Sequence, residues 1–157
     1  MLKVAGTKID LKLNDQIKNF VLKEKNKWKK DLNNVKALTS GFDPNYPFFD
    51  DLYDFSFNYL KKHFTDKFKK YRWWVNYYSE SDFTNPHKHL PSAISCILIV
   101  KSSSQNPLFF IENNKIHFVD EKDGMIMYFH SDLAHGVNKC TEERITCALD
   151  FVPTDNV

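Results

Sequence analysis

Apolar residues in the first part of the chain recur every three or four positions, the spacing of one face of an α-helix. Residues 15 to about 30 show this pattern, and Asn14 is a suitable N-cap for a helix there. Turn-forming residues interrupt it at 39–44. The same spacing then predicts a second helix from residue 48 to about 68, with a stripe formed by Phe49, Leu52, Tyr53, Ser56, Tyr59, Leu60 and Phe64.

After residue 70 the pattern changes to short runs of aromatic, β-branched and alternating residues, which are typical of β-strands. Asn113 and Asn114 tolerate the left-handed backbone of a tight turn, so the runs on either side of them predict a hairpin. In the last run, apolar residues alternate with Arg144, Thr146 and Asp150. The predicted strands span residues 72–78, 94–100, 108–111, 115–119, 125–129 and 144–152.

Two helices followed by six or more short strands predict a mainly β (α+β) fold, a β-sandwich or jelly roll with two N-terminal helices packed on it. The chain is 42% hydrophobic and 15% aromatic, which is enough for a substantial core. We expect residues 1–157 to form a single domain, with a helical part at 1–70 and a β core at 71–153.

The charge balance excludes a general polyanion-binding role, because 22 basic residues nearly cancel 20 acidic ones. Nucleic acid is therefore not indicated, and the lysine-rich face of the first helix is interpreted as solvated surface. The longest apolar runs are too short for a membrane span. Three cysteines without a Cys-x-x-Cys pair favour reduced thiols and a cytoplasmic location. Only Arg72 and Arg144 are arginines, so the position of each is informative.

Three histidines form a pattern that suits a metal site. His87 and His89 are two residues apart, so in an extended chain both rings project to one side. His135 lies 46 residues beyond His89, just after another predicted strand. Imidazole is a ligand for iron, zinc, copper and nickel alike, so the ligand type does not identify the metal. Chance spacing and strand capping are the structural alternatives, and His63, His117 and His130 are interpreted as core or surface residues.

Arg144 adds to this pattern, because it stands nine residues after His135 and begins the last alternating strand. If Arg144 and Thr146 face the interior, a guanidinium and a hydroxyl lie beside the proposed metal, and a buried guanidinium needs an anionic partner. A dicarboxylate that reaches from the metal to Arg144 would supply one. An ion pair with Glu142, Asp150 or another acid of the chain is the alternative.

Five segments in this order resemble the 2-oxoglutarate- and Fe(II)-dependent oxygenases, and most closely the small members from marine bacteria and phages. The nine-residue spacing between His135 and Arg144 is also one that these enzymes favour. The resemblance implies a double-stranded β-helix, the cupin-like form of the jelly roll. The segments are Trp74-Val75-Asn76, His87-Lys88-His89-Leu90-Pro91-Ser92-Ala93-Ile94-Ser95, Gly124-Met125-Ile126-Met127-Tyr128-Phe129-His130-Ser131, His135-Gly136-Val137 and Arg144-Ile145-Thr146.

By that resemblance, His87, His89 and His135 would bind Fe(II), and 2-oxoglutarate would be the co-substrate consumed with O2. Arg144, supported by Thr146, would bind the distal carboxylate of 2-oxoglutarate. Asn76 and Tyr77 would be further co-substrate contacts, and no catalytic residue is implied beyond the metal ligands. The expected reaction is the hydroxylation of an unidentified substrate, which could be a peptide side chain, a nucleobase or a small metabolite.

Two departures from the family pattern leave other functions open. His89 stands where these oxygenases most often have a carboxylate, and Ser95-Cys96-Ile97 lacks the tyrosines that tend to follow this segment. Both departures favour a three-histidine, cupin-like dioxygenase that does not use 2-oxoglutarate. A non-catalytic jelly-roll binding module, with the lysine-rich helix as its partner surface, is the alternative from another class. The segment 78–86 is expected to border the opening, with Asp82, Phe83 and Asn85 as candidate contacts.

Overall fold

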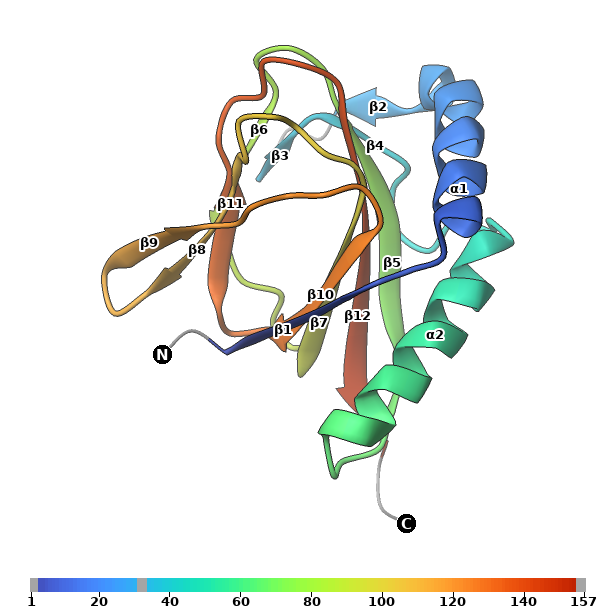
Figure 1. Ribbon diagram of the computed structural model, residues 1–157, viewed down its shortest axis with the longest axis vertical. Helices are drawn as coiled ribbons and strands as arrows, with labels where there is room; N and C mark the ends of the chain where they lie inside the picture. The colour runs from blue at the N-terminus through green and yellow to red at the C-terminus, as the bar shows by residue number, and fades with distance from the viewer. Residues whose placement is uncertain (1–2, 31–33, 155–157) are drawn as a thin grey trace.

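The computed structural model describes residues 3–30 and 34–154, which form two antiparallel β-sheets and two α-helices (Figure 1). The elements are β1 (Val4–Lys8), α1 (Leu11–Glu24), a 3-10 turn (Lys25–Lys27), β2 (Lys29–Lys30), β3 (Val35–Lys36), β4 (Leu38–Thr39), α2 (Phe48–His63), β5 (Phe68–Tyr78), β6 (Phe83–His87), β7 (Ile94–Lys101), β8 (Leu108–Glu112), β9 (Lys115–Phe118), β10 (Met125–His130), β11 (Ala134–Val137) and β12 (Arg144–Pro153).

The larger sheet has the strand order β1-β10-β7-β12-β5-β4-β2, and the smaller sheet has the order β3-β6-β11-β8-β9. Figure 1 shows the two sheets facing each other, with both helices on the outer side of the larger sheet. This arrangement confirms the predicted mainly β fold with two helices packed on a jelly roll. No helix in the described part of the chain is long and apolar enough to cross a membrane.

Two cores hold these layers together. One lies between the helices and the larger sheet, where residues such as Ile17, Leu52 and Leu149 are completely buried. The other lies between the two sheets and includes Phe110 and Phe129, whose rings meet edge to face with centroids 4.9 Å apart. Because helices cover one face of the larger sheet and a second sheet covers the other, its central strands are buried on both faces.

β12 shows how the sequence pattern divides the two cores. Its odd-numbered residues, from Ile145 to Phe151, belong to the core beneath the helices. Its even-numbered residues point into the space between the sheets, where Arg144, Thr146 and Ala148 line a cavity. The alternation predicted from the sequence is therefore present, and Arg144 and Thr146 face the interior.

The predicted helix limits need correction. α1 begins at Leu11, and its N-cap is Asp10, whose side chain accepts a hydrogen bond of 3.0 Å from the amide of Lys12. Asn14 lies inside the helix instead, and its amide group donates to the carbonyl of Val100. α2 ends at His63, and β5 already begins at Phe68, because Phe64 turns to an extended backbone conformation.

The N-terminal part, which the pattern predicts to be helical over residues 1–70, also supplies strands to both sheets. β1 pairs with β10, β4 pairs with β5, and β3 pairs with β6. The hairpin at Asn113 and Asn114 is confirmed: both residues have positive φ, 52° and 60°, and connect β8 to β9.

Candidate metal centre and adjoining cavities

His87, His89 and His135 come together between the two sheets. His87 ends β6, and His135 is its direct cross-strand partner on β11. His89 lies in the loop after β6, where its backbone amide donates a 2.9 Å hydrogen bond to the carbonyl of Ser131. One potential ligand atom from each of the three side chains lies within 4.8 Å of the other two.

Hydrogen bonds at the far side of each ring determine which nitrogen faces the centre of the cluster. The Nδ1 atom of His87 lies 2.8 Å from the carbonyl of Asn85, and that of His135 lies 3.2 Å from the carbonyl of Leu133. The Nδ1 atom of His89 lies 3.0 Å from a carboxylate oxygen of Asp150. Carbonyl and carboxylate oxygens only accept hydrogen bonds, so each Nδ1 is the protonated nitrogen. The three Nε2 atoms are then left with lone pairs.

The Nε2 atoms of His87 and His89 are 2.9 Å apart. Two lone pairs at this distance repel each other unless a positive charge lies beside them. Nitrogens that bind one metal ion at right angles, each at about 2.1 Å, are about 3 Å apart. The donor set therefore fits a transition-metal ion such as iron, for which imidazole is a suitable ligand.

Burial favours the neutral, metal-binding form of His135 and His87. Burial lowers the pKa of His135 well below its ordinary value, and the neighbouring His89 and His87 lower it further. Burial also lowers the pKa of His87, against the opposing hydrogen bond to Asn85. Because metal binding requires unprotonated imidazole, these shifts keep both side chains available as ligands at neutral pH.

Asp150 adjoins this cluster, and the sequence pattern does not assign it to a metal site. Its side chain is 5% exposed and accepts hydrogen bonds from His89 and from the hydroxyl of Ser95, the latter at 2.7 Å. Ser131 lies 2.8 Å from Ser95 and completes a buried polar network. The network orients the ring of His89 and places a negative charge behind it, as carboxylates often do behind metal-binding histidines. The only signal in the sequence is the position of Asp150 on the interior face of β12.

Asp150→Asn is expected to weaken metal binding without unfolding the protein. The amide of asparagine carries no negative charge, so its hydrogen bond to Nδ1 of His89 makes the ring less basic than the carboxylate does. His89 therefore becomes a poorer metal ligand. We expect a loss of Fe(II) affinity of about 10- to 100-fold, which is typical of residues that support a metal ligand. Anaerobic titration measures this loss. Asp54→Asn, on the outer side of α2, is the matched control. Unchanged affinity in Asp150→Asn would mean that the carboxylate does not support the site.

Gly136 allows β11 to bring His135 into the cluster. A Cβ atom at this position would lie 2.7 Å from the ring of Phe109 and 3.0 Å from the carbonyl oxygen of Thr84, which is backbone and cannot easily move. We expect Gly136→Ala to lower the free energy of unfolding by about 1–3 kcal/mol, measured by urea denaturation. Gly6→Ala in β1 is the control, because its Cβ would make only ordinary contacts, the nearest at 3.5 Å. Equal stability of the two variants would contradict the prediction.

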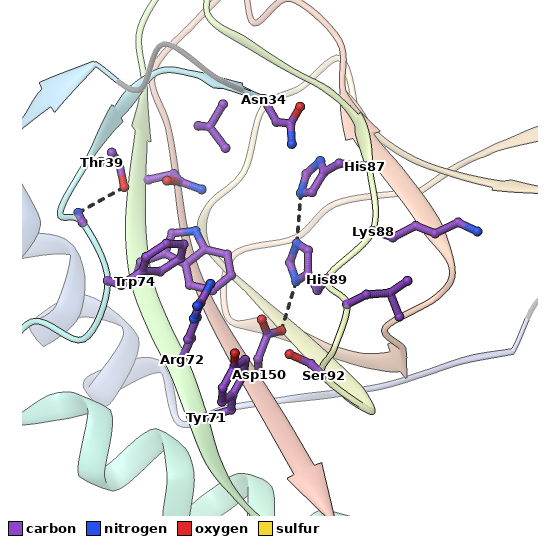
Figure 2. Close-up of a pocket in the computed structure, with 15 residues that line it drawn as sticks. Asn34, Thr39, Tyr71, Arg72, Trp74, His87, Lys88, His89, Ser92 and Asp150 are labelled. Carbon is purple, nitrogen blue, oxygen red and sulfur yellow. Dashed lines mark hydrogen bonds and ion pairs between the residues drawn. The ribbon is translucent and has the colours of Figure 1, made fainter.

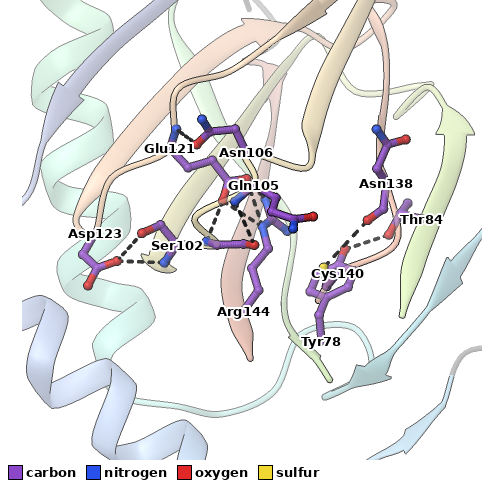
Figure 3. A network of polar contacts seen from close by, with 11 residues as sticks. Tyr78, Thr84, Ser102, Gln105, Asn106, Glu121, Asp123, Asn138, Cys140 and Arg144 are labelled. Carbon is purple, nitrogen blue, oxygen red and sulfur yellow. Dashed lines mark hydrogen bonds and ion pairs between the residues drawn. The ribbon is translucent and has the colours of Figure 1, made fainter. Parts of the chain in front are cut away.

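A small cavity connects the histidines with Arg144. It has a volume of about 40 Å³, and its lining includes all three histidines together with Asn76, Thr146 and Arg144. Arg144 is 1% exposed and forms a buried ion pair with Glu121, whose side chain comes from the loop between β9 and β10 (Figure 3). Arg144 therefore forms an ion pair with an acid of the chain, which was the alternative to a bound dicarboxylate. The partner is Glu121 and not Glu142 or Asp150.

Tyr77 does not line this cavity. Residues of β5 alternate between the two faces, so Val75 and Tyr77 belong to the core beneath the helices. The hydroxyl of Tyr77 donates a 2.6 Å hydrogen bond to Glu143. Tyr78 is the residue of the pair that faces the cavity, and its ring lies 5.1 Å from the guanidinium of Arg144. Tyr77 therefore does not lie where the predicted co-substrate contact requires it, whereas Asn76 lines the cavity.

A larger, open pocket of about 280 Å³ lies on the other side of the histidines (Figure 2). His87, His89 and Asp150 line its inner side, and the ring of Trp74 lies 5.3 Å from that of His89. Arg72 lies at the rim, with its guanidinium 4.7 Å from the ring of Phe42.

The candidate contacts at 78–86 lie elsewhere. Asp82 is buried and paired with Lys30, and neither Phe83 nor Asn85 lines the pocket. Asn34 and Val35, which lie beside β6, line the pocket instead. The pairing of β3 with β6, which positions them, was absent from the sequence prediction.

Comparison with known proteins identifies the fold. No protein-family model matches the sequence, and no curated protein matches it. Solved structures do match. A prolyl hydroxylase from Trichoplax adhaerens, in complex with a hypoxia inducible factor peptide fragment, has a TM-score of 0.79 at 11% identity, over 95% of this chain and 83% of that one. A viral collagen prolyl hydroxylase from Paramecium bursaria Chlorella virus-1, in complex with 2-oxoglutarate, has a TM-score of 0.72 at 12% identity, over 94% of this chain and 94% of that one.

A Burkholderia pseudomallei oxidoreductase of the 2-oxoglutarate-Fe(II) oxygenase family has a TM-score of 0.72 at 8% identity, over 95% of this chain and 84% of that one. The chain therefore has the double-stranded β-helix fold of the 2-oxoglutarate- and Fe(II)-dependent oxygenases. The resemblance inferred from its sequence motifs is confirmed at the level of the fold, and the three-histidine cluster fits that class.

Proposed function

We propose that this protein is a non-haem, Fe(II)- and 2-oxoglutarate-dependent dioxygenase that hydroxylates an unidentified substrate. The observation that carries the proposal is the convergence of three imidazole Nε2 lone pairs, each fixed by a hydrogen bond at Nδ1. A cation bound between the rings would stabilise the 2.9 Å approach of the Nε2 atoms of His87 and His89. The shared fold with oxygenases supports iron as that cation.

Each residue of the site has a role in this proposal. His87, His89 and His135 would hold the iron, and Asn76, Thr146 and Arg144 line the cavity that would receive 2-oxoglutarate. With iron bound, O2 would be the oxidant: one of its oxygen atoms would enter a C–H bond of the substrate, and the other would oxidise the keto acid with loss of CO2. The sheets cover this centre on its inner side, and the larger pocket opens it on the other.

The substrate would approach through the larger pocket, since His87 and His89 line both cavities. Trp74 and Phe42 offer ring faces there, and Arg72 offers a guanidinium without an ion-pair partner among the described residues. The Trichoplax adhaerens enzyme was solved with a peptide fragment. A peptide side chain is therefore the first substrate class to examine, before a nucleobase or a small metabolite.

Anaerobic titration of the purified protein with Fe(II) and then 2-oxoglutarate tests the proposal. We expect one bound iron per chain and the weak visible charge-transfer band of a keto acid chelated to Fe(II). Iron binding without that band would favour a three-histidine dioxygenase that does not use 2-oxoglutarate. His89 in place of a carboxylate and the ion pair of Arg144 are the observations that favour this second candidate. Failure to bind any divalent metal would favour a non-catalytic binding module.

A further inference from the structure

The guanidinium of Arg144 is divided between an internal carboxylate and the cavity. Its Nε atom donates to both carboxylate oxygens of Glu121, at 2.9 and 3.1 Å, and its Nη2 atom donates to one of them. Nη1 makes none of these bonds. It is buried and has no hydrogen-bond partner among the described residues, on a side chain that lines the cavity leading to the histidines.

Glu121 is fixed independently of Arg144. Its carboxylate also accepts a 3.2 Å hydrogen bond from the backbone amide of Ser103, and its own backbone amide donates to the side chain of Asn106 at 2.9 Å (Figure 3). Its side chain has no exposed surface. Moving this carboxylate away from Arg144 would leave a buried charge unpaired, which is strongly unfavourable. Glu121 is thus a permanent partner of Arg144, which lines the cavity.

A ligand that enters from the histidines therefore meets a guanidinium whose charge is already balanced and whose Nε/Nη2 edge is already used. Nη1 and the second N–H of Nη2 remain to bind its tail. Asn76 Oδ1, on the wall of the same cavity, is a buried acceptor without a partner. An acceptor oxygen there gives no stabilisation to a second carboxylate.

We propose that Glu121 determines which keto acid the cavity accepts: it already balances the charge of Arg144, so the tail of the ligand gains hydrogen bonds without charge pairing, and 2-oxo acids without a second carboxylate bind almost as well as 2-oxoglutarate. The inference rests on the proposed function and defines its co-substrate class as short 2-oxo acids. Glu121 is a positioning residue in this scheme, because it acts through Arg144.

The test compares two keto acids on the iron-loaded protein under anaerobic conditions. 2-Oxoglutarate and 2-oxopentanoate have the same five-carbon chain, but only the first has a second carboxylate. Dissociation constants are measured from the charge-transfer band and, independently, by calorimetry. We expect the two constants of the wild-type protein to differ by less than about tenfold, which corresponds to ordinary hydrogen bonding rather than the pairing of two opposite charges.

Glu121→Gln supplies the second arm. The amide oxygen still accepts from Arg144, but the guanidinium regains its net charge, so 2-oxoglutarate is expected to bind about tenfold tighter and 2-oxopentanoate equally well (~10-fold). Glu142→Gln is the matched control. It removes the same charge two residues from Arg144, but Glu142 is exposed and bonds to the amide of Ser104.

The outcomes separate the inference from the proposed function. A wild-type preference for 2-oxoglutarate of more than tenfold overturns the inference while the dioxygenase proposal stands. The same holds if Glu121→Gln is folded and leaves the 2-oxoglutarate affinity unchanged. Absence of a band with either acid refutes both. If Glu121→Gln does not fold, the comparison of the two acids on the wild-type protein decides alone.

Discussion

His135→Ala is expected to abolish tight Fe(II) binding, with a loss of affinity of more than about 100-fold. This exceeds the loss that is typical of residues that only support a ligand. The reason is geometric, because His135 supplies one of only three nitrogens and lies opposite His87 on the neighbouring strand. Anaerobic titration monitored by bound-metal analysis measures the effect. His87→Ala should behave alike, and because His87 is only partly buried, its substitution disturbs the packing less than that of His135.

His117→Ala is the control for this prediction. His117 lies on β9 in the hairpin that is formed with β8, outside the histidine cluster. It should bind iron as the wild-type protein does. Retention of wild-type affinity in His135→Ala, with the fold verified by circular dichroism, would show that the cluster is not the metal site.

Arg144→Met is expected to destabilise the protein by about 3–5 kcal/mol, because it leaves the carboxylate of Glu121 buried without its counter-ion. The size of the effect comes from the stranded charge rather than from the lost attraction. The double variant Arg144→Met/Glu121→Leu removes both charges and should recover most of the lost stability. Urea denaturation of the two single variants and the double variant completes the cycle.

Arg72→Met provides the comparison for the Arg144 cycle. Arg72 is exposed and lies against the rings of Phe42 and Tyr71, so its loss should change the free energy of unfolding by less than about 1 kcal/mol. Equal effects of Arg72→Met and Arg144→Met would contradict the assignment of Arg144 to a buried ion pair. If the double variant is no more stable than the single variants, the apolar side chains at positions 144 and 121 do not fill the space of the buried ion pair.

The sequence pattern predicts those parts of the fold that depend on local periodicity. The alternation along β12 places Arg144 and Thr146 on the interior face, and Asn113 with Asn114 identifies the hairpin. The spacing of apolar residues also predicts that the two helices exist. It does not predict where they begin, because an N-cap depends on a single side-chain hydrogen bond. Asp10 makes that bond and Asn14 does not.

What could not be predicted depends on contacts between distant segments. β1 is short and contains Gly6, and it is a strand because β10 lies beside it. Glu121 lies in a loop, and nothing in its neighbourhood indicates that it reaches Arg144 across 23 residues. Tyr77 and Tyr78 are adjacent residues of one type, so only the phase of β5 against β12 distinguishes the one that faces the cavity.

The position of β12 in the larger sheet has a consequence for how the protein is made. β12 lies between β5 and β7, yet it is synthesised after every other described strand. Until it inserts, both neighbours present open edges that can pair with other chains. The same strand carries Arg144 and Asp150, so the nascent chain cannot complete its histidine centre before the sheet closes. Chaperone dependence and aggregation during expression should therefore respond most strongly to changes in this one strand.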